Sequence, residues 1–481
     1  MSMKNKISQP GFIPFKIFRI LLFLNLFVFL TACGEKEKSS GQAAPNRLDS
    51  TLMEKYGKPY NDLASVRLVI ISPHNTDIQY EYERAFSIYH AVKYGQRVDI
   101  EWRDVGGGST AILRHLRNIY ENSDRSGIDI VWGGGDFNFE KMAGEGILQK
   151  MRIMDDALAN IPYTFSGLRM YDAERRWCGS AISGYGLLYN IPLLKRLDVA
   201  PPVRWEDLGE KRFYGLIGLA DPAQSGSAAA SYEMIVQSGG NWQEGWDRLL
   251  GILGNTKRFY AGAGDAAEAL PAGEVAVATC IDYYGISRVI KYPDTLKYVS
   301  PRGETAFNPD PIAILKNPPS PELAQRMVDF VLSLKGQALW ALPVGDADGP
   351  ERAALGRLPI RRDVYEIYKG RLMPQIINPF EVGQSMNIDT RIWSASFGLL
   401  RQLVWAAAVR NTEGLYAAKQ KILESNFDEG LVKEFNTLPS NVSTIEKVAE
   451  TAELLRDAKQ NDIIVTDWIS FFKEKYDRIA D

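Results

Sequence analysis

Apolar runs alternate with amphipathic segments in the first half of the chain. The stretches 66–72, 97–105 and 127–136 are rich in apolar and β-branched residues, which is typical of strands. The segments between them, 78–94 and 106–122, repeat apolar residues at helical spacing. This strand–helix–strand–helix–strand order predicts a parallel sheet with right-handed crossovers.

A second series of the same kind follows. A strand within 184–197 precedes a helix opened by Pro192, a strand at 214–220 precedes a helix that starts near Ser225, and a third strand covers 275–281. Beyond residue 320 the pattern is helical to the end of the chain. The sequence therefore predicts an α/β protein with a helical C-terminal extension.

Polar and glycine-rich loops follow the first three predicted strands. They contain His74, the segment Gly106–Ser109, and the run from Gly133 and Gly134 to Asp136. Ligands of parallel sheets bind beyond the carboxyl ends of the strands, so these loops predict a ligand site. A turn or capping role for His74 remains an alternative.

Two features of the second series could also contact a ligand. Ser225, Gly226 and Ser227 open a helix, whose free amides and hydroxyls suit an anion; capping alone is the alternative. Tyr283 and Tyr284 follow the strand 275–281. Either one ring packs inward, or the strand ends there and both rings reach a cleft.

The N-terminus carries an export signal. Four basic residues and no acid precede the apolar run "LLFLNLFVFL", which is short for a membrane span. The run ends in Leu30–Cys33, "LTAC", which resembles the lipobox of bacterial lipoproteins and implies cleavage before Cys33 and lipidation of its thiol. An uncleaved anchor or a plain signal peptide is the alternative.

Charge, hydrophobic content and cysteine content bear on the possible partners and on the core of the protein. Removing residues 1–32 takes the formal net charge from −3 to −7, which argues against nucleic-acid binding. With 45% hydrophobic residues the chain can bury sizeable cores. Cys178 and Cys280 either pair in an oxidising compartment or remain buried free thiols.

Several stretches together resemble the extracellular solute-binding proteins of bacterial ABC importers, of the kind related to periplasmic ferric-iron-binding proteins. They are "LVIISPHN", "DIVWGGGD", "SGYGLLYN", "DPAQSGSAA", "GEVAVATCIDYYG" and the region from "FVLSLKGQALW" to "LPIRRDVY". The resemblance implies a two-lobed periplasmic-binding-protein fold (type II-like), in which the chain crosses between lobes near 177–190 and near 307–315.

The implied domain organisation follows from these crossings. It comprises a lipoprotein signal peptide (1–32), a lipidated tether (33–65), a discontinuous first lobe (66–180 and 308–370), a second lobe (181–307), and C-terminal helices (371–481) packed on the first lobe. The implied partners are a permease and an ATPase, with the lipid as membrane contact. The protein is expected to be a monomer on the periplasmic or cell-surface side.

In ferric-binding relatives an adjacent tyrosine pair, a histidine, a carboxylate and a synergistic anion hold Fe(III). Tyr283, Tyr284 and His74 match the first two groups, and Gly226–Ser227 resemble the anion-binding turn. A bound cation would deprotonate the phenols.

One position departs from this pattern. Glycines stand where relatives place the carboxylate, so that Asp136 or Glu140 would have to substitute. Backbone amides of Gly133 and Gly134 would instead suit an anionic ligand such as a phosphorylated compound.

Other functions remain open at this stage. A surface lipoprotein that senses a ligand without transporting it would carry the same features. A secreted enzyme is disfavoured, because "SGYG" lacks the first glycine of the Gly-x-Ser-x-Gly motif and neither a His-x-x-x-His motif nor a P-loop occurs in the sequence.

Overall fold

The computed structural model describes residues 47–106 and 108–481. The expected signal peptide and the expected lipidation site, Cys33, lie outside the described residues. Helix α1 (Arg47–Tyr56) falls in the segment expected as a tether, and its Leu52 is buried beside Leu63 and Ala91. The folded chain therefore begins before residue 66, which corrects the expected end of the tether.

Six strands form the first sheet, in the order β13-β6-β12-β3-β1-β2. They are β1 (Ser65–Ile71), β2 (Arg97–Arg103), β3 (Ile130–Trp132), β6 (Cys178–Ser183), β12 (Asn308–Ile314) and β13 (Leu358–Pro359). Strand β1 pairs in parallel with β2 and β3, as the alternating pattern predicts. Strands β12, β6 and β13 join by antiparallel pairing.

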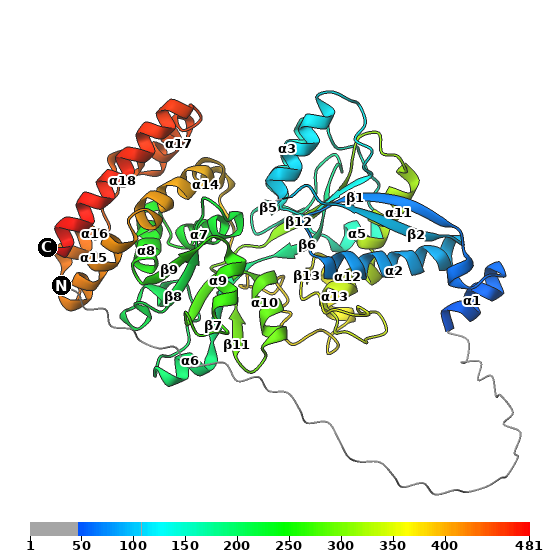
Figure 1. The fold of residues 1–481 in the computed structure, drawn as a ribbon, viewed down its shortest axis with the longest axis horizontal. Coiled ribbons are helices and arrows are strands. Elements are labelled where there is room, and N and C mark those ends of the chain that lie inside the picture. Colours follow the sequence, from blue (N-terminus) through cyan, green and yellow to red (C-terminus); the bar gives the residue numbers. More distant parts are fainter. Residues whose placement is uncertain (1–46, 107) are drawn as a thin grey trace, which may run out of the picture. The chain divides into compact units, whose positions relative to one another are not determined.

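Helices cover both faces of this sheet, and strand β1 is apolar on both sides. In β1, Leu68 and Ile70 belong to one core and Val69 and Ile71 to the other, as expected for side chains that alternate along a strand. The first core is closed by α2 (Thr76–Tyr94), α11 (Pro321–Val331) and α12 (Leu334–Ala341); the second by α3 (Ser109–Tyr120) and α4 (Asp136–Gly144) (Figure 1).

The second sheet has five strands, in the order β11-β7-β10-β8-β9. They are β7 (Tyr185–Asn190), β8 (Ile217–Ala220), β9 (Thr256–Tyr260), β10 (Val277–Ile281) and β11 (Leu296–Val299). Its helices are α6 (Ile191–Arg196), α7 (Gly226–Gln237), α8 (Trp242–Gly254), α9 (Ala263–Ala269) and α10 (Asp282–Lys291). Strand β8 runs parallel to β9 and β10.

The chain passes from the first sheet to the second between β6 and β7 and returns between β11 and β12. A Cβ atom on Gly184 would lie 2.5 Å from Phe307 Cε1, so the two crossing segments pack directly on each other. The amide of Gly184 donates to Asp282 Oδ2 at 2.7 Å. These features confirm the expected two-lobed α/β fold with hinge crossovers.

The C-terminal helices pack on the second lobe, and the expectation that they cover the first lobe is wrong. Helix α14 (Thr390–Val404) lies along α7, and α15 (Thr412–Glu424) lies on α8 (Figure 1). The reason is apolar surface on α8, where Trp246 lies beside Phe472, with ring centroids 6.4 Å apart. The extension is completed by α16 (Glu429–Phe435), α17 (Ile445–Leu454) and α18 (Ala458–Ala480).

Reaching the second lobe requires a third crossing, within residues 374–389. Its Met386 N donates to Thr305 O of the second crossing, and its Ile388 N donates to Ser166 O in the turn between β4 and β5, each at 2.9 Å. The hydroxyl of Thr305 in turn accepts from Tyr185 N of the first crossing at 3.1 Å. The remaining short elements are α5 (Asp155–Asn160), β4 (Thr164–Phe165), β5 (Leu168–Arg169) and α13 (Arg362–Ile367).

Among the described residues, one helix is long and apolar enough to cross a membrane, Thr390–Val409. It comprises α14 and a π-helical turn, Trp405–Val409, and its buried residues, Leu399 and Leu403 among them, pack into the protein core. Packing against α7 therefore accounts for its apolar side. The two cysteines of the described residues are free and buried, Cys178 on β6 and Cys280 on β10.

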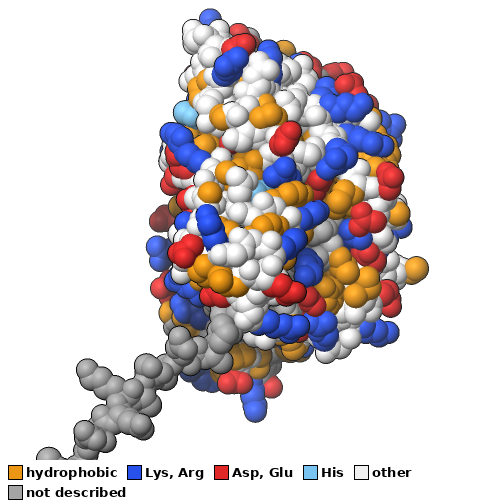
Figure 2. Space-filling model, turned by 90° about the vertical axis from the view of Figure 1, so that its right-hand side faces the viewer, with side chains coloured by type: hydrophobic (Ala, Val, Ile, Leu, Met, Phe, Trp, Pro, Cys, Tyr) orange, Lys and Arg blue, Asp and Glu red, His pale blue; other side chains and the backbone are white. Residues whose placement is uncertain are grey.

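One face of the protein carries side chains of both charges. On the face shown in Figure 2, Lys and Arg side chains are interspersed with Asp and Glu side chains. Such a face lacks the single-sign field that draws a polyanion.

Candidate functional site

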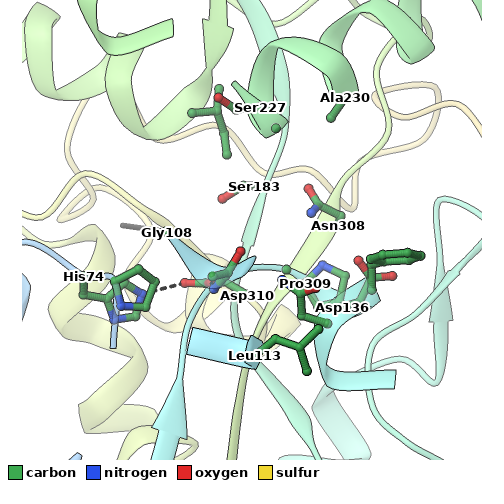
Figure 3. A pocket seen from close by; sticks show the side chains of 18 of the residues that line it. His74, Gly108, Leu113, Asp136, Ser183, Ser227, Ala230, Asn308, Pro309 and Asp310 are labelled. Carbon is green, nitrogen blue, oxygen red and sulfur yellow. Dashed lines mark hydrogen bonds and ion pairs between the residues drawn. The ribbon is translucent and has the colours of Figure 1, made fainter. Parts of the chain in front are cut away.

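A cleft of about 890 Å³ lies between the two lobes and is lined from both of them. The first lobe contributes His74, Asp136 and Asp310, and the second contributes Ser227 and Ala230. In Figure 3 these groups face each other across the cleft, with Ser183 and Asn308 of the hinge segments between them. The loops predicted to form a site do meet here.

Five helices begin at this cleft. Its lining includes Asn75 before α2, Ser109 of α3, Asp136 of α4, Gly226 of α7 and Tyr283 of α10. The first amides of a helix lack intrahelical partners and carry partial positive charge. Neither α3 nor α4 has a side-chain cap. The convergence of these helix starts makes the cleft favourable for an anion.

The two adjacent tyrosines both line the cleft. Strand β10 ends at Ile281 and α10 starts at the next residue, so Tyr283 and Tyr284 share the first helical turn, with ring centroids 5.4 Å apart. Gly285 follows them within the same helix. It stays small because a Cβ atom would lie 2.1 Å from Tyr298 Cδ2.

Both phenols are held in the protonated form. Burial raises the pKa of Tyr283, an effect that the nearby Arg357 partly offsets, and burial also raises the pKa of Tyr284. Tyr283 Oη accepts a hydrogen bond from Asn75 Nδ2. In this state the tyrosines are hydrogen-bonding groups and aromatic surfaces.

The floor of the cleft is a buried charged cluster that the sequence did not reveal. Arg357 Nη1 lies 2.6 Å from Asp310 Oδ2, and His74 Nε2 lies 2.8 Å from the same oxygen. Only 7% of the Arg357 side chain is exposed. Burial alone would raise the pKa of Asp310, yet Arg357 and His74 hold it well below its usual range.

Three atoms of this floor are buried without a hydrogen-bond partner among the described residues: Arg357 Nε, His74 Nδ1 and Asn308 Oδ1. Buried polar groups are nearly always paired, because an unpaired group costs about 1–3 kcal/mol. The guanidinium Nε–H is a donor that a bound anion could accept from.

The glycine run has a different role from the one expected. Gly133 N donates to Pro311 O and Gly134 N donates to Asp310 Oδ1, so neither amide is available to a ligand. Both residues have positive φ, 95° and 110°. A Cβ atom on Gly134 would lie 2.3 Å from Ser109 Cβ. The glycines therefore permit close packing, and Gly133 itself does not line the cleft.

At the start of α7, one serine caps the helix and the other lines the cleft. Ser225 is the cap, accepting from Ala228 N at 3.3 Å, and does not line the cleft. Gly226 and Ser227 do line it.

Of the two carboxylates weighed from the sequence, only one reaches the cleft. Asp136 lines it, and burial raises its pKa to about 6. Glu140 lies outside the lining and pairs with Arg169 at 2.8 Å.

Comparison with known proteins supports this architecture. Residues 128–345 match the family model described as bacterial extracellular solute-binding protein. The phosphoglycerate transport regulatory protein PgtC of Salmonella typhimurium is 30% identical over 186 residues, which is 37% of this chain and 46% of that protein. The chain thus covers about half the length of this curated relative.

Two solved structures show the same fold. The periplasmic binding protein AfuA of Actinobacillus pleuropneumoniae, with fructose-6-phosphate bound, has a TM-score of 0.54 and 19% identity, over 71% of this chain and 98% of that one. Iron-bound HitA of Pseudomonas aeruginosa has a TM-score of 0.51 and 21% identity, over 70% of this chain and 98% of that one.

These findings define a two-lobed protein of the periplasmic-binding-protein fold. The family match confirms the resemblance to bacterial extracellular solute-binding proteins that the sequence indicates. The family and the similar structures are binding proteins rather than enzymes.

Proposed function

We propose that the chain is the ligand-binding component of an ABC-type importer and that it captures a small organic anion, a phosphorylated compound in particular. It is exported, held at the membrane by lipid on Cys33, and delivers its ligand as a monomer to a permease and its ATPase. The ligand contacts His74, Asp136, Gly226, Ser227, Tyr283 and Tyr284, together with Arg357.

The observation that carries this proposal is Arg357 at the floor of the cleft, buried and with Nε unpartnered. Asp310 balances its charge, so the converging helix starts leave the cleft favourable for an added anion. The amides at Gly226 and the hydroxyl of Ser227 supply further donors. PgtC, by its name, concerns phosphoglycerate transport, and AfuA holds a sugar phosphate.

Ferric ion is the second candidate, favoured by the tyrosine pair and by the likeness to iron-bound HitA. Two observations oppose ferric ion. The guanidinium of Arg357 lies 5.5 Å from the centre of the Tyr283 ring and would repel a trivalent cation. His74 Nε2 is already engaged by Asp310.

The decisive experiment is purification without added ligand, followed by mass spectrometry and metal analysis of what accompanies the protein. The apo-protein is then titrated calorimetrically with a sugar phosphate, with inorganic phosphate and with ferric citrate. We expect phosphate-ester binding and no visible charge-transfer colour. A coloured protein carrying stoichiometric iron, bleached by acid, would reverse the choice between the two ligands.

Transport and anchoring have separate tests. A ligand sensor without a transport role is the alternative function, and the word "regulatory" in the name of PgtC favours it. Genes for a permease and an ATPase beside this one, and ligand uptake lost on its deletion, support import. Incorporation of labelled palmitate that Cys33→Ser abolishes supports the lipid anchor.

A further inference from the structure

Helix α14, from the C-terminal extension, forms part of the cleft wall. Trp393, Phe397 and Arg401 all line the cleft, although they lie beyond the segment that matches the family model. The two aromatic rings are stacked, with centroids 4.9 Å apart and planes 17° apart, and both are half-buried. An aromatic face is thus presented to the cleft interior.

This wall is held firmly on the second lobe. Ser396 Oγ donates to the buried Glu233 Oε1 of α7 at 2.8 Å, and Asp389 N donates to Gln237 Oε1 at 2.9 Å. At the other end of α14, Arg401 donates to the carbonyl oxygens of Pro222 and Ala223. The aromatic pair is therefore positioned before any ligand arrives, which lowers the entropic cost of binding.

The first lobe also presents an aromatic ring and cations to this cleft. Phe137, at the start of α4, is 54% exposed, and Lys141 Nζ lies 4.2 Å from the centre of its ring. Arg114 of α3 is exposed and lines the cleft, and its side chain makes no ion pair or hydrogen bond with another described residue. Aromatic rings and unneutralised cations therefore come from both lobes.

The size of the cleft agrees with a ligand larger than an ion. At about 890 Å³ it lies in the range of sites that enclose drug-sized molecules, roughly 300–1,000 Å³. A phosphate or a metal ion bound at Arg357 would leave most of that volume to water.

We propose that α14 builds a second subsite, in which Trp393 and Phe397 stack on a planar ring of the ligand while its anionic group binds at Arg357. The ligand class is a phosphate ester that carries an aromatic ring. This inference rests on the proposed function, because it takes the inner end of the cleft to be the anion site.

The test compares methyl phosphate with phenyl phosphate, which share the anion and differ in the ring. Calorimetric titration of the wild type should give a Kd for phenyl phosphate about tenfold below that for methyl phosphate, as expected for aromatic stacking plus apolar burial. Trp393→Leu and Phe397→Leu keep apolar bulk but remove a ring, and each should reduce this ratio about threefold or more. Trp393→Phe should retain most of it.

Trp405→Leu is the matched control, because Trp405 lies on the following π-helical turn and does not line the cleft. Its ratio should equal that of the wild type. Equal binding of the two esters by the wild type, or an unchanged ratio in Trp393→Leu and Phe397→Leu, overturns the aromatic subsite alone. A wild type that binds neither ester overturns the anion site of the proposed function as well.

Discussion

Asn75 and Tyr283 meet across the cleft. Asn75 Nδ2, at the start of α2 in the first lobe, donates to the hydroxyl of Tyr283, on α10 in the second lobe. The side-chain oxygen of Asn75 caps α2, because Asn75 Oδ1 accepts a hydrogen bond from Ile78 N at 3.0 Å. One side chain thus fixes a helix start and joins the two lobes.

Removing the Tyr283 hydroxyl should weaken ligand binding without unfolding the protein. We expect Tyr283→Phe to raise the Kd for a sugar phosphate by about fivefold, the equivalent of one hydrogen bond of about 1 kcal/mol. The thermal midpoint should change little, since the ring itself remains. Tyr260→Phe, at a hydroxyl outside the cleft lining, is the control, and equal affinities for the two variants would remove Tyr283 from the site.

Arg357 should prove necessary for both stability and binding, in separable ways. Arg357→Ala removes the guanidinium partner of the buried Asp310 and leaves it only His74 and the Gly134 amide, so we expect urea unfolding to show a loss of about 3 kcal/mol. Arg357→Ala combined with Asp310→Asn should recover much of that loss while anion binding stays absent. Anion binding by the stable double variant would show that Arg357 serves folding only.

Glu233 should make stability depend on pH. Burial raises its pKa to about 7, so the folded state holds a proton that the unfolded chain releases near pH 4.5. The free energy of unfolding should therefore fall as pH rises from about 4.5 to 7, by up to about 1.4 kcal/mol per unit. Glu233→Gln should abolish that decline.

The control for this comparison is Glu450→Gln, at an exposed position of α17. Its unfolding free energy should follow that of the wild type at every pH. Parallel pH profiles for Glu233→Gln and the wild type would mean that Glu233 is ionised in the folded protein.

The second glycine of the run should tolerate no side chain. At Gly134 the backbone φ is +110° and a Cβ atom would meet Ser109 Cβ at 2.3 Å, so Gly134→Ala should cost about 2 kcal/mol or more and displace the start of α3. Gly144 lies at the end of α4, and a Cβ atom there would meet no other atom within 4 Å. Gly144→Ala is therefore the control and should be neutral or slightly stabilising. Similar melting temperatures for the two variants would contradict this assignment.

The sequence pattern predicted the parts of the site that depend on local order. Strands followed by polar turns placed His74, Asp136, Ser227 and Tyr283 at one edge, and the structure brings all four to the cleft. The rule that ligands sit at the carboxyl ends of parallel strands needs no knowledge of distant contacts.

The charged cluster at the floor of the cleft could not be predicted, because its residues lie far apart in the sequence and meet only in the folded protein. Arg357 lies 283 residues from His74 in an irregular segment with no periodicity, and Asp310 lies within strand β12 between two prolines. The packing side of the C-terminal helices was missed for a related reason. An amphipathic pattern shows which face of a helix is buried and says nothing of which lobe receives it.

The third crossing, within 374–389, changes how the lobes can move. Its bond to Thr305 places it beside the second connector, and Thr305 Oγ1 accepts from Tyr185 N of the first connector, so three backbone segments are linked to one another between the lobes. Three linked connectors resist sliding and twisting of one lobe against the other more than two connectors would. Bending of the lobes about these connectors remains the easier motion. A single proteolytic cut in this segment would leave the two lobes joined by the other two connectors and the C-terminal helices held on the second lobe by packing alone. A nicked protein should therefore release its ligand faster while keeping its fold.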